Sequence, residues 1–208
     1  MDAVVLVSGG IDSIVAYKLI EKQGGNVYPL FIDYGQLAAK KEWDACQQLL
    51  AECEFPKAQR IDVNGFGKAI SSGLTDKSKD IQKPFLPCRN LLFLTIAASY
   101  AKTKGCTAIA IGLLNEKSHI FPDQTESFVV NTNFAINSAL DDNYIILTPL
   151  IQFSKSEVIK LAEEYGIPLQ KTYSCHSGED IYCGKCVSCK EILSSGEESK
   201  IKQFRKGD

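Results

Sequence analysis

Runs of apolar residues alternate with amphipathic segments along most of the chain. The run at residues 3–7 is continuous and rich in valine, which predicts a strand that is buried on both faces. Shorter patterns of the same kind predict strands at residues 27–32, 60–63 and 107–113. Apolar residues at helical spacing predict helices over residues 13–23, 38–53, 90–103, 125–140 and, behind a capping box, 154–166.

Strands that alternate with helices predict an α/β fold in which a parallel sheet carries helices on both faces. The pattern breaks at residues 64–87, where glycine, serine, lysine and proline predict a long loop with one short helix. Loops of this length often form lids or binding loops. Residues 115–124 predict a second loop, and the polar residues 194–208 predict a frayed tail.

Composition narrows the range of functions. The 208 residues are 45% hydrophobic and 23% charged, which suffices for one domain with a buried core. The net charge of −2 provides no basic field for nucleic acid or an anionic membrane. No apolar run reaches the ~20 residues that cross a bilayer, and the N-terminus lacks the features of a signal peptide. We therefore expect a cytoplasmic protein that binds neither membranes nor nucleic acid.

A glycine-rich segment, Ser8-Gly9-Gly10-Ile11-Asp12-Ser13, lies between the first predicted strand and the first helix. Ligands of parallel sheets bind at this carboxyl edge. Glycine lets the backbone approach an anion, and the N–H groups of a helix N-terminus favour negative charge. The segment is neither a Walker A loop nor a G-x-G-x-x-G motif. It is either a phosphate-binding loop or a tight turn in which Asp12 or Ser13 caps the helix.

Half of the eight cysteines lie within 15 residues of one another, namely Cys175, Cys183, Cys186 and Cys189. The other four are scattered, which is the pattern of an intracellular protein with free thiols and one metal site. Zinc favours four thiolates in a tetrahedron, and such a closed site is structural. An iron–sulfur cluster and unligated thiols are the alternatives, with His176 as a spare ligand.

The segment S-G-G-x-D-S resembles the pyrophosphate loop of the N-type ATP pyrophosphatases, which split ATP into AMP and pyrophosphate. Further matches are Asp33-Tyr34-Gly35-Gln36, Pro87-Cys88-Arg89-Asn90, Lys155 and the cysteine spacing. Together they make nearly the whole chain similar to the 7-cyano-7-deazaguanine synthases of the queuosine pathway. The resemblance implies an adenine-nucleotide α-hydrolase-like domain at residues 1–170. A zinc-binding segment and tail, residues 171–208, would pack on this domain, and the protein would be a homodimer.

The resemblance also implies a reaction that uses ATP, Mg²⁺ and a structural zinc. The carboxylate of 7-carboxy-7-deazaguanine attacks the α-phosphate of ATP, and ammonia displaces AMP from the acyl-adenylate to form an amide. A second adenylation then dehydrates the amide to the nitrile. Mg²⁺, loop amides and cationic side chains would offset the charge that develops on the leaving pyrophosphate.

Roles for individual residues follow from the same resemblance. The residues that would hold pyrophosphate are Ser8, Gly9, Gly10 and Ser13. Asp12 would act on Mg²⁺, and Arg89 and Lys155 would be active-site cations, unless they are a surface charge and a capping charge. Tyr34 would stack on adenine or shape its pocket, unless it belongs to a plain turn.

The substrate would contact Asn90, Asp123 and His119, although His119 could equally be an ordinary loop histidine. Cys88 needs no chemical role, and we expect it to be a partly buried free thiol.

Residues 113–128 depart from the family's pocket-forming run, V-N-x-x-D-Y-S-G-Y-P-D-C-R-P-E-F. Pro122, Asp123 and Phe128 match it, but Lys117, His119, Gln124-Thr125 and Ser127 replace the family's Asp, Ser, Cys-Arg and Glu. A site built on hydrogen bonds rejects ligands that cannot satisfy them. The first hypothesis is still the ordinary nitrile-forming synthase.

Three other hypotheses remain open. A divergent relative could pass 7-carboxy-7-deazaguanine or a similar acid to another amine, such as that of a partner protein in anti-phage defence. The chain could be a nucleotide-binding module without turnover, although its intact glycine loop argues against this. A sulfur-transferring RNA enzyme on the same loop would usually carry basic segments that this near-neutral chain lacks.

Overall fold

The computed structural model describes residues 1–115 and 121–201. Its five parallel strands form one sheet in the order β3-β2-β1-β4-β5. The strands are β1 (Ala3–Leu6), β2 (Val27–Asp33), β3 (Gln59–Asp62), β4 (Ala108–Ala110) and β5 (Ile145–Leu147). All four residues of the central strand β1 are buried, because helices cover both faces of the sheet. The predicted fold class is confirmed.

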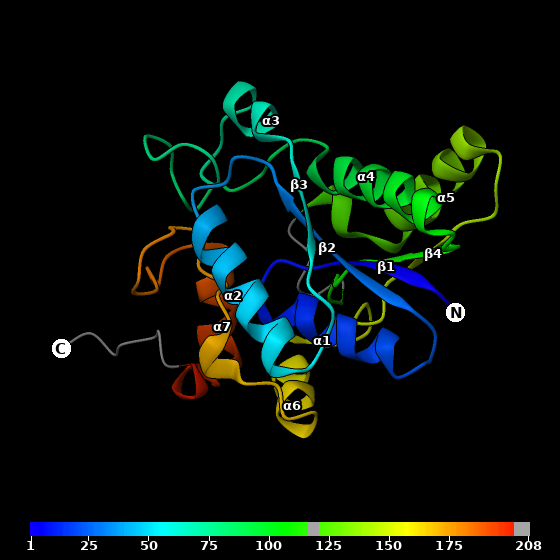
Figure 1. Ribbon diagram of the computed structural model, residues 1–208. Helices are drawn as coiled ribbons and strands as arrows, with labels where there is room; N and C mark the ends of the chain where they lie inside the picture. The colour runs from blue at the N-terminus through cyan, green and yellow to red at the C-terminus, as the bar shows by residue number, and fades with distance from the viewer. Residues whose placement is uncertain (116–120, 202–208) are drawn as a thin grey trace.

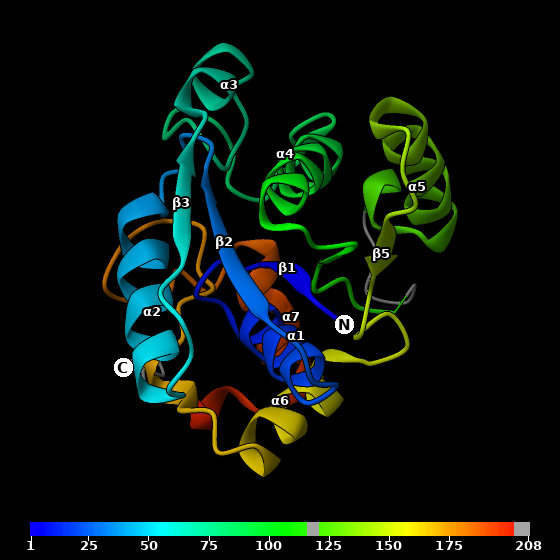
Figure 2. The ribbon, with the colours of Figure 1, turned by 45° about the vertical axis from the view of Figure 1, so that its right-hand side comes forward.

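The helices divide between the two faces of the sheet. Their bounds are α1 (Ile11–Glu21), α2 (Ala39–Glu52), α3 (Asn64–Ala69), α4 (Arg89–Lys104), α5 (Glu126–Leu140), α6 (Lys155–Glu164) and α7 (Val187–Ser195), with short 3-10 turns η2 (Pro122–Gln124), η3 (Leu169–Lys171) and η4 (Glu198–Lys200). α1, α2, α6 and α7 lie on one side of the sheet and α4 and α5 on the other (Figures 1 and 2). In the described ranges, none of the helices combines the length and the apolar character that a membrane span requires.

Alternate residues of β1 contribute to two separate hydrophobic cores. Ala3 and Val5 pack with α1, α2 and the C-terminal segment, whereas Val4 and Leu6 pack with α4. Because side chains along a strand point to opposite faces, a continuous apolar run is what a strand in this position requires.

The end of β4 differs from the prediction. A strand was expected through residue 113, but β4 ends at Ala110. Ile111 still donates its N–H to the Leu147 carbonyl oxygen at 3.0 Å, and the chain then passes over the start of α1. A Cβ at Gly112 would lie 3.0 Å from the Asp12 carbonyl oxygen, so this close approach depends on glycine. The departure brings the chain after β4 against the glycine loop.

The apolar pattern does not predict β5. This edge strand has three residues, only Ile146 is buried, and Ile145 is 50% exposed. A strand so short and so exposed leaves little alternation to detect in the sequence.

Residues 64–87 form a loop with one short helix, α3, as predicted. Leu74 and Leu86 are nonetheless buried and pack with Tyr34, so the loop is anchored to the end of β2. Pro84 from this loop contributes to the cavity described below.

The predicted frayed tail is wrong for residues 194–201. α7 extends to Ser195 and ends at Gly196, which has a φ of +73°. Ile201 is 1% exposed and belongs to the core around α1 and α6. A buried apolar residue that follows a glycine C-cap, here Ile201, packs the end of this segment against the core. Residues 202–208 lie outside the described ranges.

Candidate active site

The glycine loop connects β1 to α1 at the carboxyl edge of the sheet. Gly9 has a φ of +77°, and a Cβ there would lie 2.4 Å from the Glu42 carbonyl oxygen of α2. The position therefore excludes every residue but glycine. Ser13 Oγ accepts a hydrogen bond from the Ser8 N–H at 3.0 Å and donates one to the Gly10 carbonyl oxygen at 3.0 Å. These bonds give the loop a defined shape around its backbone N–H groups.

The predicted cap of the helix by Asp12 or Ser13 is wrong. α1 begins at Ile11 and its N-cap is Gly10, which has no side-chain hydrogen bond to the helix. Neither Asp12 nor Ser13 is the cap, because both lie inside the first turn. Without a side-chain cap, the N–H groups at the start of α1 remain available to an anion.

A cavity of about 280 Å³ opens over this loop. Its size is close to the lower end of small-molecule pockets, roughly 300 Å³. Its lining includes groups of residues from the loop (Ser8, Gly10, Asp12, Ser13), the start of α4 (Arg89, Asn90) and the C-terminal segment (Ser174, His176, Ser188, Glu191). The structure thus brings together residues that are distant in sequence.

Lys155, the first residue of α6, lies behind the loop side of the cavity. It is 6% exposed, and its Nζ lies 2.7 and 2.6 Å from the two carboxylate oxygens of Asp12 and 3.7 Å from Glu191 Oε2. Burial alone would lower the pKa of Lys155, but the charges of Asp12 and Glu191 raise it, so the side chain stays cationic. The interpretation of Lys155 as a capping charge is wrong, because Ser154 and Glu157 form the capping box of α6.

The start of α4 carries the second cation. Arg89 lies over the Phe93 ring, 5.8 Å from its centroid, and its guanidinium contacts Asn90 Oδ1 at 3.3 Å. The residue before it, Cys88, has a φ of +60°, so the chain enters α4 through a left-handed turn. Arg89 therefore faces the cavity and is not a free surface charge.

Asp123 braces this helix from behind. Its backbone carbonyl oxygen accepts a hydrogen bond from Asn90 Nδ2 at 2.8 Å, and its Oδ2 accepts one from the Asn90 N–H at 3.3 Å. Its Oδ1 is buried and has no hydrogen-bond partner within the described ranges. A buried carboxylate oxygen without a partner is costly, which marks Asp123 as a residue with an unfilled contact.

Tyr34, at the end of β2, lies in the cavity wall and is 6% exposed. Its ring centroid is 5.2 Å from that of Phe93. Burial raises the pKa of Tyr34 to about 12 although the Arg89 charge opposes this, so the hydroxyl stays protonated near neutral pH. Tyr34 is therefore part of an aromatic wall of the cavity, and its role toward adenine stays a prediction.

Two acidic residues of the cavity, Glu42 and Glu191, were not identified from the sequence. Glu42, in the first turn of α2, faces the cavity, and burial raises its pKa to about 7. The available signal for Glu42 was its place shortly after the Asp33-Tyr34-Gly35-Gln36 run. No local pattern, however, shows that α2 folds against the glycine loop. Glu191 carried no signal at all, since only the tertiary fold places it beside Lys155.

His176 was expected only as a spare metal ligand. It faces the cavity instead, its Nδ1 is buried without a hydrogen-bond partner within the described ranges, and burial lowers its pKa to about 4. The imidazole is therefore neutral near neutral pH.

The four clustered cysteines converge as predicted. The sulfurs of Cys175, Cys183, Cys186 and Cys189 all lie within 4.8 Å of one another. The N–H groups of Cys183 and Cys186 donate to the sulfurs of Cys175 and Cys183, each at 3.3 Å, which stabilises thiolates. Gly184 has a φ of +66° in the turn between two ligands. The cluster therefore offers four sulfur donors to a metal ion.

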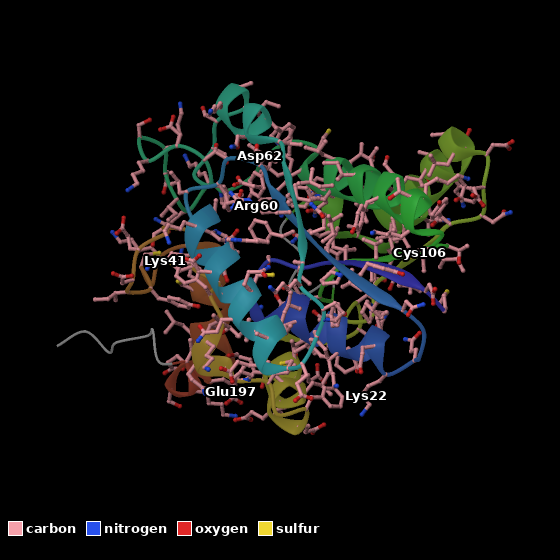
Figure 3. The ribbon with its side chains drawn as sticks, in the orientation of Figure 1. Lys22, Lys41, Arg60, Asp62, Cys106 and Glu197 are labelled. Atoms are coloured by element: carbon pink, nitrogen blue, oxygen red, sulfur yellow. The ribbon has the colours of Figure 1, made fainter. Side chains whose placement is uncertain are left out.

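The remaining cysteines form no second cluster in the part of the chain that the structure describes. Cys106 lies at the far end of the molecule from α7 (Figure 3). Cys88 is exposed, so the prediction of a partly buried thiol is wrong; the residue lies outside α4, at its N-cap, in a left-handed backbone conformation. His119 lies outside the described residues, so its predicted role stays a prediction.

Comparison with known proteins agrees with these features. A family model described as queuosine biosynthesis protein QueC matches residues 2–198. A 7-cyano-7-deazaguanine synthase from Campylobacter fetus is 35% identical over 209 residues, covering 96% of this chain and 94% of the relative. A protein of the same description from Nautilia profundicola is 35% identical and covers 96% and 95%.

Solved structures share the fold. A predicted subunit of tRNA methyltransferase from Methanocaldococcus jannaschii superposes with a TM-score of 0.54 at 22% identity, covering 79% of this chain and 75% of that protein. The U34-tRNA thiolase NcsA from Methanococcus maripaludis, solved with its [4Fe-4S] cluster, gives a TM-score of 0.52 at 17% identity, covering 100% and 76%. At these identities the likeness shows an adenine-nucleotide α-hydrolase-like fold and nothing more specific.

Proposed function

The chain belongs to the queuosine biosynthesis protein QueC family and is an ATP-dependent C–N ligase, and we propose that it converts 7-carboxy-7-deazaguanine into 7-cyano-7-deazaguanine. ATP would be cleaved to AMP and pyrophosphate, and ammonia would supply the nitrogen. The observation that carries this proposal is one cavity that joins the glycine loop to Arg89 and Asn90.

The loop end of the cavity suits the triphosphate. The uncapped N–H groups at the start of α1 would hold pyrophosphate, with aid from the hydroxyls of Ser8 and Ser13. Gly9 and Gly10 would let the anion approach the backbone closely. Arg89 would offset the charge on the leaving group from the opposite wall. Mg²⁺, when bound with ATP, would supply further positive charge there, with Asp12 as the carboxylate that faces it. Lys155 would act through Asp12, since it lies behind that residue.

The other end of the cavity suits the acid. The Asn90 side chain is fixed by Asp123, and Tyr34 and Phe93 provide apolar surface for a planar ring. We propose Asn90 and Asp123 as substrate-binding residues, Asp123 through its unpaired Oδ1. The carboxylate held here would attack the α-phosphate, and the resulting acyl-adenylate would react with the amine.

The cysteine site would hold zinc. Tetrahedral zinc with Zn–S bonds of about 2.3 Å places its sulfurs about 3.8 Å apart. The Cys183 and Cys189 sulfurs are 4.0 Å apart, which fits such a site with little adjustment. Four protein donors close the coordination, so the metal would be structural. We also propose that residues 171–208 form one segment on the domain of residues 1–170, and that the protein is a homodimer.

The test is a mass-spectrometric assay of the purified protein with ATP, Mg²⁺, 7-carboxy-7-deazaguanine and ammonium. AMP, pyrophosphate and the nitrile are the expected products. The loss-of-function variant is Asp12→Asn, which keeps a polar partner for Lys155. It should lower pyrophosphate release by about 10²-fold or more without loss of fold.

Other outcomes separate the remaining hypotheses. AMP without the nitrile would identify a divergent member that passes the acid to another amine, such as that of a protein. Absence of AMP with this acid would contradict the proposed substrate. Absence of AMP with every acid tested, despite ATP binding, would identify a non-catalytic nucleotide-binding module.

A further inference from the structure

Glu42 is an acidic residue of the cavity to which the proposed function gives no role, and unlike Glu191 it has no lysine partner among the described residues. Glu42 lines the same cavity as Ser8 and Arg89, and its backbone carbonyl oxygen lies against Gly9. The cavity must accept a triphosphate and a carboxylate, both anionic. A further carboxylate repels these ligands unless it serves a cationic or proton-donating ligand.

The carboxylate of Glu42 is held in a fixed position. Gln36 Nε2 donates to Glu42 Oε2 at 2.8 Å, and Gln36 Oε1 in turn accepts the Tyr34 N–H at 3.0 Å. Gln36 is thereby locked between the backbone after β2 and the first turn of α2. Glu42 Oε1 has no hydrogen bond to any residue of the described ranges, so one oxygen remains for a ligand in the cavity.

The surroundings favour a carboxyl group that exchanges a proton. The largest effect on Glu42 is burial, which raises its pKa to about 7, whereas the Gln36 hydrogen bond and the Arg89 charge oppose the rise and Asp33 adds to it. The other titratable groups that face it belong to the adjoining elements, namely Tyr34, Cys46 and Tyr173. A base with a pKa near the working pH is the most effective kind.

We propose that Glu42 is the residue that binds the amine nucleophile in its ammonium form and removes its proton. This inference rests on the proposed function, because an acyl-adenylate must be present for the amine to attack. Gln36 is the positioning residue that aims the carboxylate.

The step balances as follows. Glu42 takes one proton from the ammonium ion, which frees the nitrogen lone pair. The nitrogen forms a bond to the acyl carbon, and the bond between that carbon and the AMP oxygen breaks, with the electron pair remaining on AMP. The second proton lost by the nitrogen leaves with the AMP phosphate. The products are the amide, AMP and protonated Glu42.

A metal ion fits Glu42 less well than an amine. The only group of three or more metal-binding side chains in residues 1–115 and 121–201 is the cysteine cluster, so Glu42 has no partners for a coordination shell. One carboxylate oxygen is also occupied by the Gln36 amide, and the Arg89 guanidinium is nearby. A single open oxygen matches one N–H of an ammonium group.

The experiment separates the two half-reactions in Glu42→Gln, which keeps the shape of the side chain and removes the base. With ATP, Mg²⁺ and 7-carboxy-7-deazaguanine, we expect pyrophosphate release in the first turnover to match that of the unaltered protein. With ammonium added, we expect amide formation to fall by about 10²-fold or more, the usual size of general-base catalysis. Glu52→Gln, at the exposed end of the same helix, is the matched control and should change neither step.

Hydroxylamine provides the decisive comparison, because it is largely unprotonated at neutral pH and needs no base. Glu42→Gln should form the hydroxamate at the normal rate, which a merely misfolded or misaligned site would not do. An equal loss with hydroxylamine and ammonium, or loss of first-turnover pyrophosphate release, would overturn the inference. So would unaltered amide formation.

Two further arms complete the design. A short peptide with a free amino terminus replaces ammonium to distinguish a protein amine from ammonia, and dependence on Glu42 is expected with whichever amine reacts. If the unaltered protein itself releases no pyrophosphate with the acid, the proposed function fails and the inference fails with it, a result that differs from any defect confined to Glu42→Gln.

Discussion

The two walls of the cavity are built in different ways. The loop wall, residues 8–13, follows the fully buried strand β1 and is shaped by two serine hydrogen bonds and one obligatory glycine. The cysteine wall, residues 173–191, has one helical turn of α7 and otherwise irregular backbone, gathered around four sulfurs. The loop wall continues directly from the sheet, whereas the order of the cysteine wall would depend on the proposed metal.

Specific contacts join the walls. The Tyr173 N–H donates to the Gly9 carbonyl oxygen at 2.9 Å, and Lys155 lies between Asp12 of the loop wall and Glu191 of the cysteine wall. Lys41 of α2 also pairs with Asp180, and Figure 3 shows Lys41 on the side of α2 that faces this segment. The difference teaches that the proposed metal site would help to set the shape of the cavity, because the cysteine wall supplies part of its lining.

Metal removal should have the largest effect. Binding of zinc to small four-ligand sites is worth about 10–16 kcal/mol, and here that energy would order the cysteine wall. We expect a chelator, or Cys183→Ser, to lower the melting temperature, to expose residues 171–201 to proteolysis, and to abolish pyrophosphate release. Cys53→Ser, outside the cluster, is the control. Unchanged proteolysis after verified loss of the metal would contradict the comparison.

Loss of Lys155, which links the two walls, should lower the free energy of unfolding by less than metal removal does. Lys155→Met leaves Asp12 and Glu191 without their shared cation, and loss of one member of a buried ion pair costs about 3–5 kcal/mol. Denaturant unfolding measures this change. Lys40→Met removes only an exposed pair with Asp44 and should leave stability unaltered. Equal effects of the two variants would show that Lys155 is not an essential link.

Gly9→Ala alters the loop wall alone and should lower the free energy of unfolding by about 2–4 kcal/mol. Part of this is the left-handed backbone, about 1–2 kcal/mol, and the rest is overlap with α2. Gly24→Ala is a matched control, since Gly24 has a φ of +80° but no atoms within 4 Å of a new Cβ. The excess cost of Gly9→Ala over Gly24→Ala, measured by thermal unfolding, isolates the contact with α2; no excess would refute that contact.

The smallest effect is expected from Ser154→Ala, which removes the N-cap of α6, the helix that begins with Lys155. Loss of such a cap costs about 1 kcal/mol. Thr125→Ala removes the equivalent cap of α5 on the other face and should cost a similar amount. Only Ser154→Ala should also raise the KM for ATP, because only α6 carries a residue of the link. A KM change in both variants would mean that general loosening explains the effect.

Much of the fold could be predicted from local pattern. The apolar run of β1, the helical spacing of α4 and the capping box of α6 each depend on residues close in sequence. β5 could not be predicted, because a three-residue edge strand carries too little alternation. The order at residues 194–201 could not be predicted either, because it depends on Ile201 reaching a core made by other elements.

In the candidate site, too, some features follow from local sequence and others only from the tertiary structure. By itself, the sequence determined where the glycine loop and the four sulfur donors lie, because both are short motifs whose backbone geometry is set by neighbouring residues. Only the tertiary structure decided which charges meet. Lys155 and Asp12 are 143 positions apart, and Glu42 and His176 face the cavity only because α2 and the cysteine wall fold against the loop. Burial and pairing depend on atoms that local sequence does not specify, and these contacts assign Lys155, Glu42 and Glu191 their places in the site.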